Sequence, residues 1–164
     1  GMQVAALKAN REARIQSVAA MFATEIADLM RSNQAAGALP GPNPYLGDFT
    51  SPLQPAIKSY CLSPAATASC ANALEIANAQ MTDWLARVDA ELPGARVQIC
   101  ADIKPFDNRG LPQWDCMSTA GATTVVKIGW VQASNERWKG EAFAFDRRSR
   151  PSIVVPFVAP GAGA

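Results

Sequence analysis

The chain has 164 residues, of which 49% are hydrophobic and 18% are charged. This length and this balance predict one globular domain with a single core, and they exclude an intrinsically disordered protein. The formal net charge of +1 argues against nucleic acid or an anionic membrane surface as a partner, because both attract proteins with a large excess of positive charge.

Residue types suited to catalysis are scarce in this sequence. It contains no histidine, the commonest general base and metal ligand, so Ser-His-Asp and Cys-His catalysis are excluded. Two carboxylate pairs, Glu25 with Asp28 and Asp89 with Glu91, could act as acid and base, but their predicted places on solvated helix faces favour ordinary surface charges. Because no base, nucleophile pair or cofactor motif is found, we expect neither an enzyme nor a bound cofactor.

Residues 4–33 predict a long N-terminal helix, because this stretch lacks Gly and Pro and is rich in good helix formers. In its second half, apolar residues at steps of three and four form one stripe that should pack on a core: Ile15, Val18, Phe22, Ile26, Leu29 and Met30. In its first half, charged residues interrupt the stripe and leave Val4 and Leu7 with few neighbours. We expect this first half to project from the domain.

Residues 34–55 contain so many Gly and Pro that the sequence predicts no helix or strand there, only a long loop that could serve as a contact surface. A second helix is predicted to begin near Ser63 or Ser69 and to end at Leu92, before Pro93 and Gly94. The apolar side of this helix, expected in the core, comprises Leu74, Ala77, Met81, Trp84, Leu85, Val88 and Leu92.

The rest of the chain predicts β-structure, because the apolar residues now recur at every second position. The strand candidates are residues 95–103, 123–132 and 141–146, the last two joined by a polar connection over 133–140. Residues 152–158 can form only an edge strand or a loop, because Pro151 and Pro156 lack an N–H donor. Helices followed by strands predict an α+β domain, with residues 159–164 as a frayed tail.

The chain contains four cysteines: Cys61, Cys70, Cys100 and Cys116. No two of them form a CxxC pair, so zinc-ribbon and thioredoxin-like sites are excluded and two disulfides are expected. Of the three possible pairings, Cys61 with Cys70 and Cys100 with Cys116 closes local loops and needs the least rearrangement of the chain. Disulfides persist in oxidising compartments, which predicts a periplasmic or extracellular location.

The start of the chain bears on this location. Gly1 before Met2 is typical of the residue that remains when a protease removes an expression tag, so it is left out of the predicted fold. The sequence contains no run of about 18 apolar residues and therefore predicts no membrane span in the chain as given. We expect the native protein to carry an export signal and an apolar helical segment before Met2.

Two further groups of residues allow a binding role. The first gathers oxygen ligands that could hold calcium: Asp102, Asp107, Asn108 and Asp115. The second is a basic cluster that could meet an acidic partner subunit or phosphate: Arg147, Arg148 and Arg150. The spacing differs from that of an EF-hand and residues 107–110 are typical of a turn, so no metal is expected, and a solvated strand end is the simpler interpretation of the arginines.

The four tryptophans divide into two pairs. Trp84 and Trp130 fit the core faces of a helix and a strand. Trp114 and Trp138 lie in polar loops, where an exposed tryptophan favours an interface. The residues of a possible subunit interface are therefore Val4, Leu7, Trp114 and Trp138.

The order of these features resembles that of a type IV pilin, and more closely that of the PilV-like minor pilins, the type IV pilus modification family. Residues 17–33 (SVAAMFATEIADLMRSN) resemble the family's helix motif A-x-x-L-A-x-D-M-A-D-R-M-R-A-N. The first cysteine pair and residues 81–94 (MTDWLARVDAELPG) resemble the family's cysteine pair and its helix from D-x-x-x-W to L-P-G-G. Residues 97–100 with Cys116 resemble its later cysteine pair, and residues 125–131 (VVKIGWV) resemble its V-x-V-x-W strand.

The resemblance implies a type IV pilin-like fold, in which a long N-terminal helix packs on an antiparallel sheet and a second helix lies in the connecting region. A single domain would span the chain, with half of the pilin helix at residues 2–33, the connecting region at 34–94 and the sheet at 95–158. The implied function is that of a minor pilin, a structural subunit that takes part in assembling or modifying the pilus. The family's leader and apolar start are absent from this sequence, so they are expected before Met2.

The resemblance also implies partners and a location. The partners would be the major pilin, other minor pilins, the prepilin peptidase that cleaves and methylates the precursor, and the inner-membrane assembly platform. The native protein would be anchored in the inner membrane facing the periplasm and would then enter the pilus at the cell surface. The sequence does not distinguish adhesion, motility and DNA uptake as the role of the fibre.

Two other functions fit the same features. A minor pseudopilin of type II secretion shares the helix-and-sheet plan, although the paired cysteines favour the pilus. A free-standing periplasmic, disulfide-bonded binding module would use the long loop and Trp114 to hold a ligand. A cleavable signal peptide without a retained apolar helix would fit only the binding module.

Overall fold

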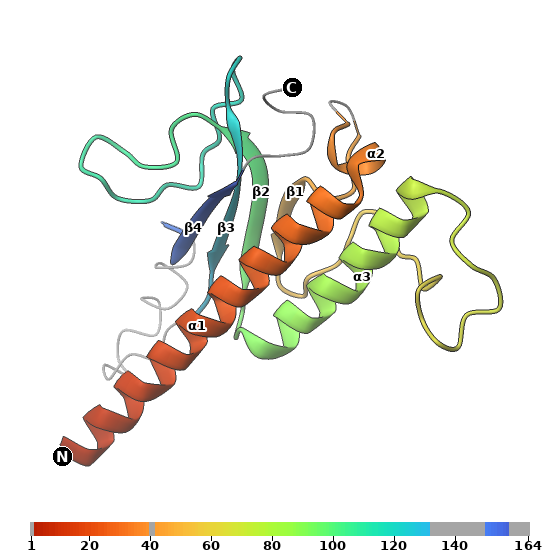
Figure 1. The fold of residues 1–164 in the computed structure, drawn as a ribbon. Helices are drawn as coiled ribbons and strands as arrows, with labels where there is room; N and C mark the ends of the chain where they lie inside the picture. The colour runs from red at the N-terminus through yellow and green to blue at the C-terminus, as the bar shows by residue number, and fades with distance from the viewer. Residues whose placement is uncertain (1, 40–41, 132–149, 158–164) are drawn as a thin grey trace.

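The computed structural model describes residues 2–39, 42–131 and 150–157. Over these residues the chain forms an α+β domain in which helices pack on an antiparallel sheet (Figure 1). The helices are α1 (Met2–Ser32), α2 (Gln34–Gly37) and α3 (Ala73–Glu91). The strands are β1 (Gly47–Thr50), β2 (Arg96–Asp102), β3 (Thr123–Gly129) and β4 (Ile153–Phe157).

Helix α1 is continuous, but its two halves lie in different surroundings. Residues 2–11 are exposed, and Val18 and Leu29 are half-buried at the edge of the core. The buried face repeats at helical spacing and consists of Ile15, Ala19, Phe22, Ala23, Ile26, Ala27 and Met30. Figure 1 shows the C-terminal half of α1 crossing the sheet and the N-terminal half extending away from the body of the domain.

The four strands pair in chain order, β1-β2-β3-β4, and every pair is antiparallel. The central pair runs from Arg96 opposite Gly129 to Asp102 opposite Thr123. Among the described strands β4 pairs with β3 alone, and this edge position explains why it tolerates Pro156. The strand candidate at 141–146 and the connection that precedes it lie outside the described residues.

The sheet is covered on both faces. Val126 and Ile128 of β3 point towards the helices and belong to the same core as Trp84 of α3. Lys127, which lies between them in the strand, points to the opposite face. The segment 103–117 folds over that opposite face, which is why residues 124–129 are buried without interruption.

Helix α3 begins later than the sequence predicts. Asn72, rather than Ser63 or Ser69, is the N-cap, and its side chain accepts a hydrogen bond from the Glu75 backbone N–H at 2.9 Å. Residues 61–72 form turns and bends instead of helix. The N-cap residue with a glutamate three positions later is the pattern of a capping box, a stronger local signal than a serine alone.

The buried face of α3 includes Met81, Trp84, Leu85 and Val88, each with 0% exposure. The prediction that Leu74 lies in this core is wrong, because its side chain is 43% exposed. Leu74 belongs to the first turn of α3, and the buried residues of the helix begin only at Ala77. Helical periodicity places Leu74 on the correct side of α3, but the core does not extend that far along the helix.

The prediction that residues 34–55 contain no regular element is also wrong. They contain α2 and the strand β1, which pairs with β2 from Gly47 to Thr50. The prolines of this segment lie outside β1 and therefore remove none of its hydrogen bonds. Tyr45 is fully buried, and its hydroxyl bonds to the Gln80 side chain of α3. Because β1 precedes α3 in the chain, the expected order of helices first and strands second does not hold.

Candidate functional site

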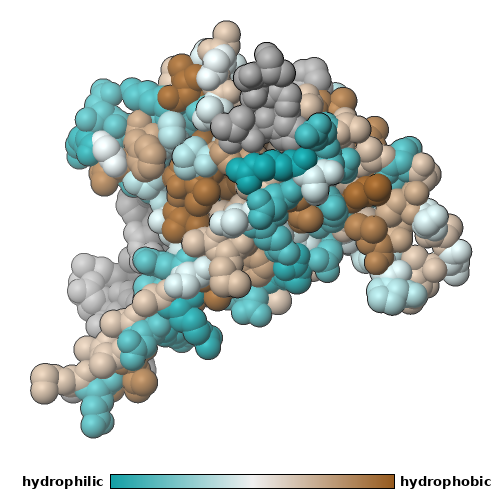
Figure 2. Space-filling model, in the orientation of Figure 1, coloured by the Kyte–Doolittle hydropathy of each residue, from teal (hydrophilic) through white to brown (hydrophobic). Residues whose placement is uncertain are grey.

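The N-terminal half of α1 presents apolar side chains to solvent. Met2, Val4 and Leu7 are 91%, 53% and 68% exposed. Three cationic side chains lie on the same half and form no ion pair with a described residue: Lys8, Arg11 and Arg14. Figure 2 shows hydrophilic and hydrophobic residues interleaved along this projecting segment. Within the described part of the chain this surface has no partner, so it is accessible to another molecule.

Glu12 and Trp130 mark the point at which α1 joins the domain. Trp130 has 0% exposure, and its indole N–H donates to Glu12 Oε1 at 3.0 Å. Ile15, one turn later, is the first buried residue of the helix. Helix α1 is therefore fixed to the domain from about its fourth turn onward.

Glu25 lines three hollows, one along α1 alone and two that also involve α3. Two of them, with volumes of about 670 and 570 Å³, share Met21, whose side chain is 70% exposed. The third, of about 770 Å³, lies between α3 and the segment 53–64. The first two are open depressions with mainly apolar walls, which suit contact with a protein surface better than enclosure of a small molecule.

Arg87 of α3 connects the two helices across this surface. Its guanidinium donates two hydrogen bonds of 2.9 Å to the Glu25 carboxylate of α1 and one of 2.9 Å to Asp83. The hydrogen bond to Glu25, aided by Asp83, raises the pKa of Arg87 above its ordinary value, against the effect of burial. Asp28, the other member of the first carboxylate pair, is bound to Arg31 at 2.9 Å. Glu25 and Asp28 are therefore held in separate ion pairs.

The second carboxylate pair is also separated by its contacts. Asp89 Oδ1 accepts hydrogen bonds from the Ser51 hydroxyl at 2.8 Å and from the Leu53 backbone N–H at 3.2 Å. Asp89 is thus half-buried and holds the segment after β1 against α3, whereas Glu91 is exposed. The expectation that both lie on a solvated helix face is correct for Glu91 and wrong for Asp89.

Both disulfides are present, and they join Cys61 with Cys70 and Cys100 with Cys116. Of the three pairings that the sequence allows, the structure has the one with local loops. The first disulfide closes the turn-rich segment before α3, and the second ties the end of the segment 103–117 to β2.

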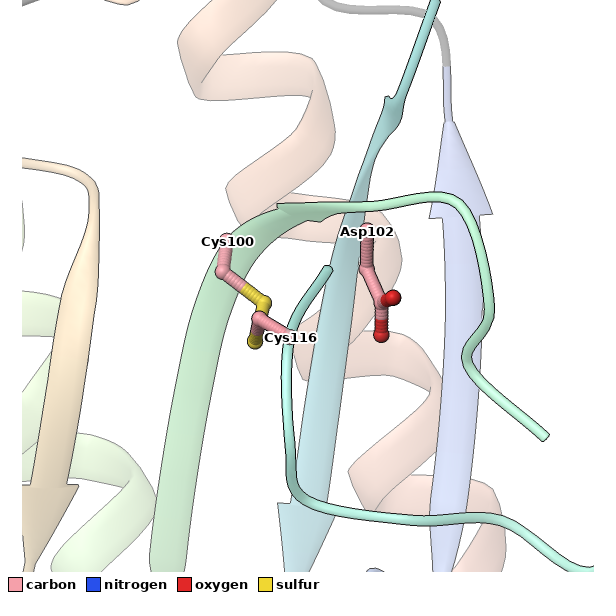
Figure 3. Close-up of side chains that lie close together, drawn as sticks. All are labelled: Cys100, Asp102 and Cys116. Carbon is pink, nitrogen blue, oxygen red and sulfur yellow. A yellow bond between two sulfur atoms is a disulfide. The ribbon is translucent and has the colours of Figure 1, made fainter. Parts of the chain in front are cut away.

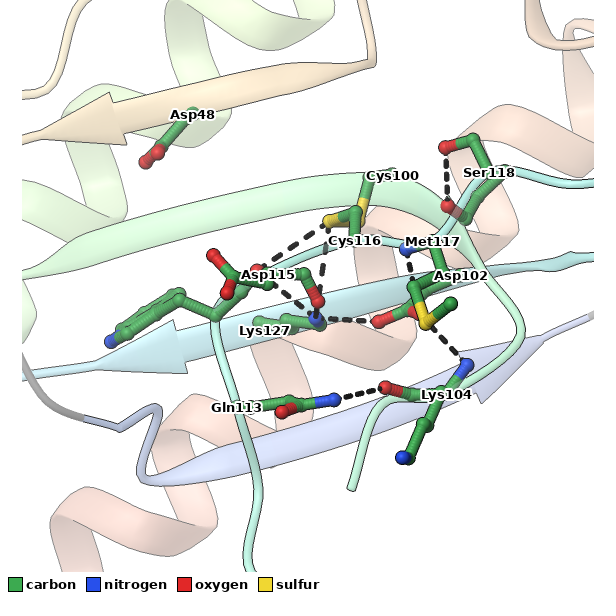
Figure 4. The surroundings of a disulfide bond; sticks show 12 residues. Asp48, Cys100, Asp102, Lys104, Gln113, Asp115, Cys116, Met117, Ser118 and Lys127 are labelled. Atoms are coloured by element: carbon green, nitrogen blue, oxygen red, sulfur yellow. Dashed lines mark hydrogen bonds and ion pairs between the residues drawn. A yellow bond between two sulfur atoms is a disulfide. The ribbon is translucent and has the colours of Figure 1, made fainter. Parts of the chain in front are cut away.

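The second disulfide lies in a cluster that also contains Asp102. The sulfur atoms of Cys100 and Cys116 and a carboxylate oxygen of Asp102 lie within 4.8 Å of one another (Figure 3). A buried cation already occupies this cluster, because the Lys127 ammonium donates to Asp102 Oδ2 at 2.6 Å (Figure 4). Since both sulfurs are bonded to each other and the ammonium neutralises the carboxylate, these residues do not suit a metal ion.

The oxygen ligands that the sequence suggests for calcium are engaged elsewhere. Asp107 Oδ1 accepts backbone hydrogen bonds from Arg109 at 2.8 Å and from Leu111 at 3.0 Å, as expected of a turn. Asn108 accepts a hydrogen bond from Lys104, and the Asp102 carboxylate is bound to Lys127. The contacts of these oxygens within the described chain separate them and do not gather them round a common point.

Asp102 joins both ends of the segment 103–117 to the sheet. Its Oδ1 atom accepts the backbone N–H groups of Lys104 at 2.8 Å and of Met117 at 3.1 Å. Burial raises the pKa of Asp102, but the hydrogen bonds from Lys127, Met117 and Lys104 outweigh burial and bring the pKa below its ordinary value. The carboxylate is therefore held in its charged form.

The prediction that Trp114 is exposed and free to form an interface is wrong. Its side chain is only 6% exposed, and the Arg96 guanidinium lies 4.2 Å above the centre of its ring. The ring also covers Gly129, where an added Cβ would lie 2.9 Å from Cζ2. The polar composition of the segment suggests a solvated loop, but its disulfide and its bonds to Lys127 draw it onto the sheet.

Of the remaining predicted positions, only Arg150 lies within the described residues. Trp138, Arg147 and Arg148 lie outside the described residues. Arg150 forms an ion pair with Asp107 at 2.9 Å and donates to the Pro112 carbonyl at 2.9 Å. Arg150 therefore serves to hold the segment 103–117 and is not simply a solvated strand end.

Comparisons with protein-family models, with curated proteins and with solved structures return no match to this chain. None of the described helices combines the length and the apolar character needed to cross a membrane.

Proposed function

We propose that the chain is the periplasm-facing domain of a minor pilin, a structural subunit that is incorporated into a type IV pilus or primes its assembly. The observation that carries this proposal is the division of α1 into two halves, one packed on a disulfide-bonded α+β domain and one standing clear of it. This plan agrees with the pilin-like resemblance of residues 17–33, 61–94 and 125–131.

The physical argument concerns the exposed half of α1. Exposed apolar side chains are unfavourable in water, and their burial becomes favourable when a neighbouring molecule covers them. A helix that leaves one subunit and packs against the next gives a head-to-tail contact, and a contact of this type builds an open filament if it does not close into a ring. The partners would be the major pilin and other minor pilins, with membrane anchorage through a segment before Met2.

A minor pseudopilin of type II secretion is the neighbouring alternative, since it would use α1 in the same way. A free-standing periplasmic binding module is a second candidate, favoured by the hollow of about 770 Å³ between α3 and the segment 53–64. Leu53, Tyr60 and Lys58 in its walls offer both apolar and charged contacts. This candidate leaves the projecting half of α1 without a role.

The test uses the full-length gene with an epitope tag in its own host. We expect the protein in the sheared pilus fraction and fewer pili in a deletion strain. The variant Leu7→Glu should reduce incorporation without changing the thermal unfolding of the domain, because Leu7 is 68% exposed. The matched control Leu74→Glu, at an exposed leucine on α3, should be incorporated normally.

Three outcomes would contradict the proposal. A freely soluble periplasmic protein that is never found in the pilus fraction would favour the binding module. A secretion defect without a pilus defect in the deletion strain would favour the pseudopilin. Equal incorporation of Leu7→Glu and wild type would remove the argument from the exposed half of α1.

A further inference from the structure

The two sulfurs of the Cys100–Cys116 disulfide lie in unequal surroundings. The Lys127 Nζ atom is 3.8 Å from Cys116 Sγ, and no such contact is formed with Cys100 among the described residues. Lys127 is fully buried, so water does not screen its charge from the sulfur. The facing anion is Asp102, and Figure 4 also draws the charged side chains of Asp48, Lys104 and Asp115 in the surroundings of the disulfide.

The ammonium is held in place by groups other than the disulfide. It donates to Asp102 Oδ2 at 2.6 Å and to the backbone carbonyls of Trp114 at 3.1 Å and Asp115 at 2.9 Å. These three bonds use all three of its N–H donors. The position of the cation beside Cys116 therefore does not depend on the S–S bond.

The ends of the segment 103–117 are also held together without the disulfide. The Ile103 N–H donates to the Met117 carbonyl at 3.0 Å, and the Ser118 hydroxyl donates to the Ala101 carbonyl at 2.7 Å. The Asp102 carboxylate accepts from the backbone at both ends of the segment. We therefore expect the two thiols to stay close to each other when both are reduced, which gives them a high effective concentration.

The first disulfide offers a comparison within the same chain. Cys61 Sγ lies 3.8 Å from the backbone carbonyl of Glu75, just as Cys116 Sγ lies 3.6 Å from that of Trp114, but within the described residues no cation contacts Cys61 or Cys70. Its sulfurs are 9 residues apart in sequence, whereas those of Cys100 and Cys116 are 16 apart. Loop length alone would therefore make Cys61–Cys70 the faster to close.

We propose that Cys116 is the nucleophilic sulfur through which the Cys100–Cys116 disulfide forms, with Lys127 as the positioning residue that favours its thiolate and an external disulfide as the oxidant. The Cys116 thiolate attacks one sulfur of the external disulfide, so a mixed disulfide forms and one external thiolate leaves. Cys100 then loses its proton, and its thiolate attacks the Cys116 sulfur and expels the second external thiolate. The protein dithiol is oxidised, and the external disulfide is reduced to two thiols, which carry the two protons that Cys116 and Cys100 have lost.

The first experiment compares the two sulfurs separately. In a chain with Cys61→Ser and Cys70→Ser, the variants Cys100→Ala and Cys116→Ala each leave one thiol, and their reaction with glutathione disulfide is followed by mass spectrometry. The cation beside Cys116 favours its thiolate, and the lower nucleophilicity of a more acidic thiol offsets only part of this gain, so Cys116 should react about threefold faster than Cys100. An equal rate, or a faster Cys100, overturns the proposal.

The second experiment changes the charges beside Cys116 in opposite directions. Lys127→Met removes the cation and should slow the reaction of Cys116, whereas Asp102→Asn removes the facing anion and should accelerate it. Rate changes of the same sign, in variants whose circular dichroism matches that of the parent chain, overturn the proposal. Lys127→Arg keeps the cation and should preserve most of the wild-type rate.

The third experiment needs no substitution, so it holds even if the variants fail to fold. The reduced wild-type chain is oxidised with glutathione disulfide, free thiols are alkylated at intervals, and the pairs are identified by peptide mapping. We expect Cys100–Cys116 to close before Cys61–Cys70, and this lead should shrink in urea, which unfolds the cluster. Earlier closure of Cys61–Cys70 under native conditions overturns the proposal.

Discussion

Lys127 is buried because β3 is covered on both faces, and a buried ammonium stays charged only if it is paired. Asp102 supplies the opposite charge at 2.6 Å, and the side chains of both residues have 0% exposure. Water therefore competes little with this pair, in contrast to the ion pairs on the surface. Loss of either partner leaves the other as a buried charge without an opposite charge beside it.

Replacement of Asp102 by Asn should lower the free energy of unfolding at pH 7 by about 3–5 kcal/mol, because it leaves the Lys127 ammonium uncompensated. Urea unfolding followed by tryptophan fluorescence measures this loss. The matched control is Asp115→Asn: its backbone carbonyl, not its carboxylate, accepts from Lys127, so its cost should be within about 0.5 kcal/mol of zero. Equal losses in both variants would contradict the role assigned to the Asp102 carboxylate.

The same carboxylate makes stability depend on pH. The pKa of Asp102 is lower in the folded protein than the ordinary value of about 3.9 expected in the unfolded chain. Its contribution is therefore complete above that value and is lost as the pH falls through the lower folded pKa. Between pH 6 and pH 3, wild type should lose more unfolding free energy than Asp102→Asn, as measured by urea titration at each pH. Identical losses would show that Asp102 is not the group responsible.

Part of this cluster is visible in the sequence. Lys127 is the single charged residue in the run TTVVKIGW, and a lone lysine in an apolar strand indicates a buried partner. The partner is not identifiable from the sequence, because Asp102 lies at the end of a different strand and a nearby group of oxygen ligands suggests calcium instead. The distance between the two charges depends on the register of β2 with β3.

The contact between α1 and α3 shows which kind of interaction holds two elements together. Trp84 is fully buried at its centre, meets the Phe22 ring edge-on at 6.2 Å and donates its indole N–H to the Phe22 carbonyl at 3.1 Å. The Arg87–Glu25 pair lies at the rim of the contact, with side chains that are 41% and 38% exposed. The buried apolar side chains at the centre should contribute most of the stability of the contact, because exposed ion pairs contribute little to the free energy of unfolding.

Trp84→Ala should therefore cost about 3–5 kcal/mol of unfolding free energy, whereas Arg87→Ala should cost less than about 1 kcal/mol. Chemical unfolding at low and high salt separates the contribution of apolar burial from that of the ion pair. High salt should reduce the cost of Arg87→Ala and leave that of Trp84→Ala unchanged, since salt screens only the ion pair. A larger cost for Arg87→Ala than for Trp84→Ala would reverse this assignment.

The elements differ in how far their local sequence predicts them. The buried stripe of α1 and the alternation of β2 follow from periodicity, because each pattern reports one face that packs on the core. The strand β1 does not follow, because a four-residue segment among prolines carries no pattern and is stabilised by its pairing with β2. The start of α3 is missed because several residues before Ala73 are acceptable caps.

At the scale of the whole molecule, the domain and the projecting half of α1 behave as separate parts. The core extends from Ile15 to Phe157 in sequence, and residues 2–11 add no buried side chain to it. The projecting half should therefore contribute little to folding and be retained for contact with other molecules. Its apolar and basic residues are the surface on which the proposed assembly depends.

Deletion of residues 2–11 should shift the melting temperature by less than about 2 °C, because no buried contact is lost. Thermal unfolding followed by circular dichroism measures this shift. As a control, Ile15→Asp in the full chain should lower the melting temperature markedly, since Ile15 is only 9% exposed and belongs to the core. A large decrease on deletion of residues 2–11 would show that this half packs on the domain in solution.

The sequence by itself determined the long amphipathic helix, the second helix around Trp84, most of the sheet and the two local disulfides. These features depend on residues close together in the chain, whose spacing is fixed by helical or strand geometry. Only the tertiary structure decided that Trp114 is buried, that β1 joins the sheet and that Lys127 meets Asp102 beside Cys116. These contacts depend on which segment covers the far face of the sheet, and that choice depends on the packing of the whole chain.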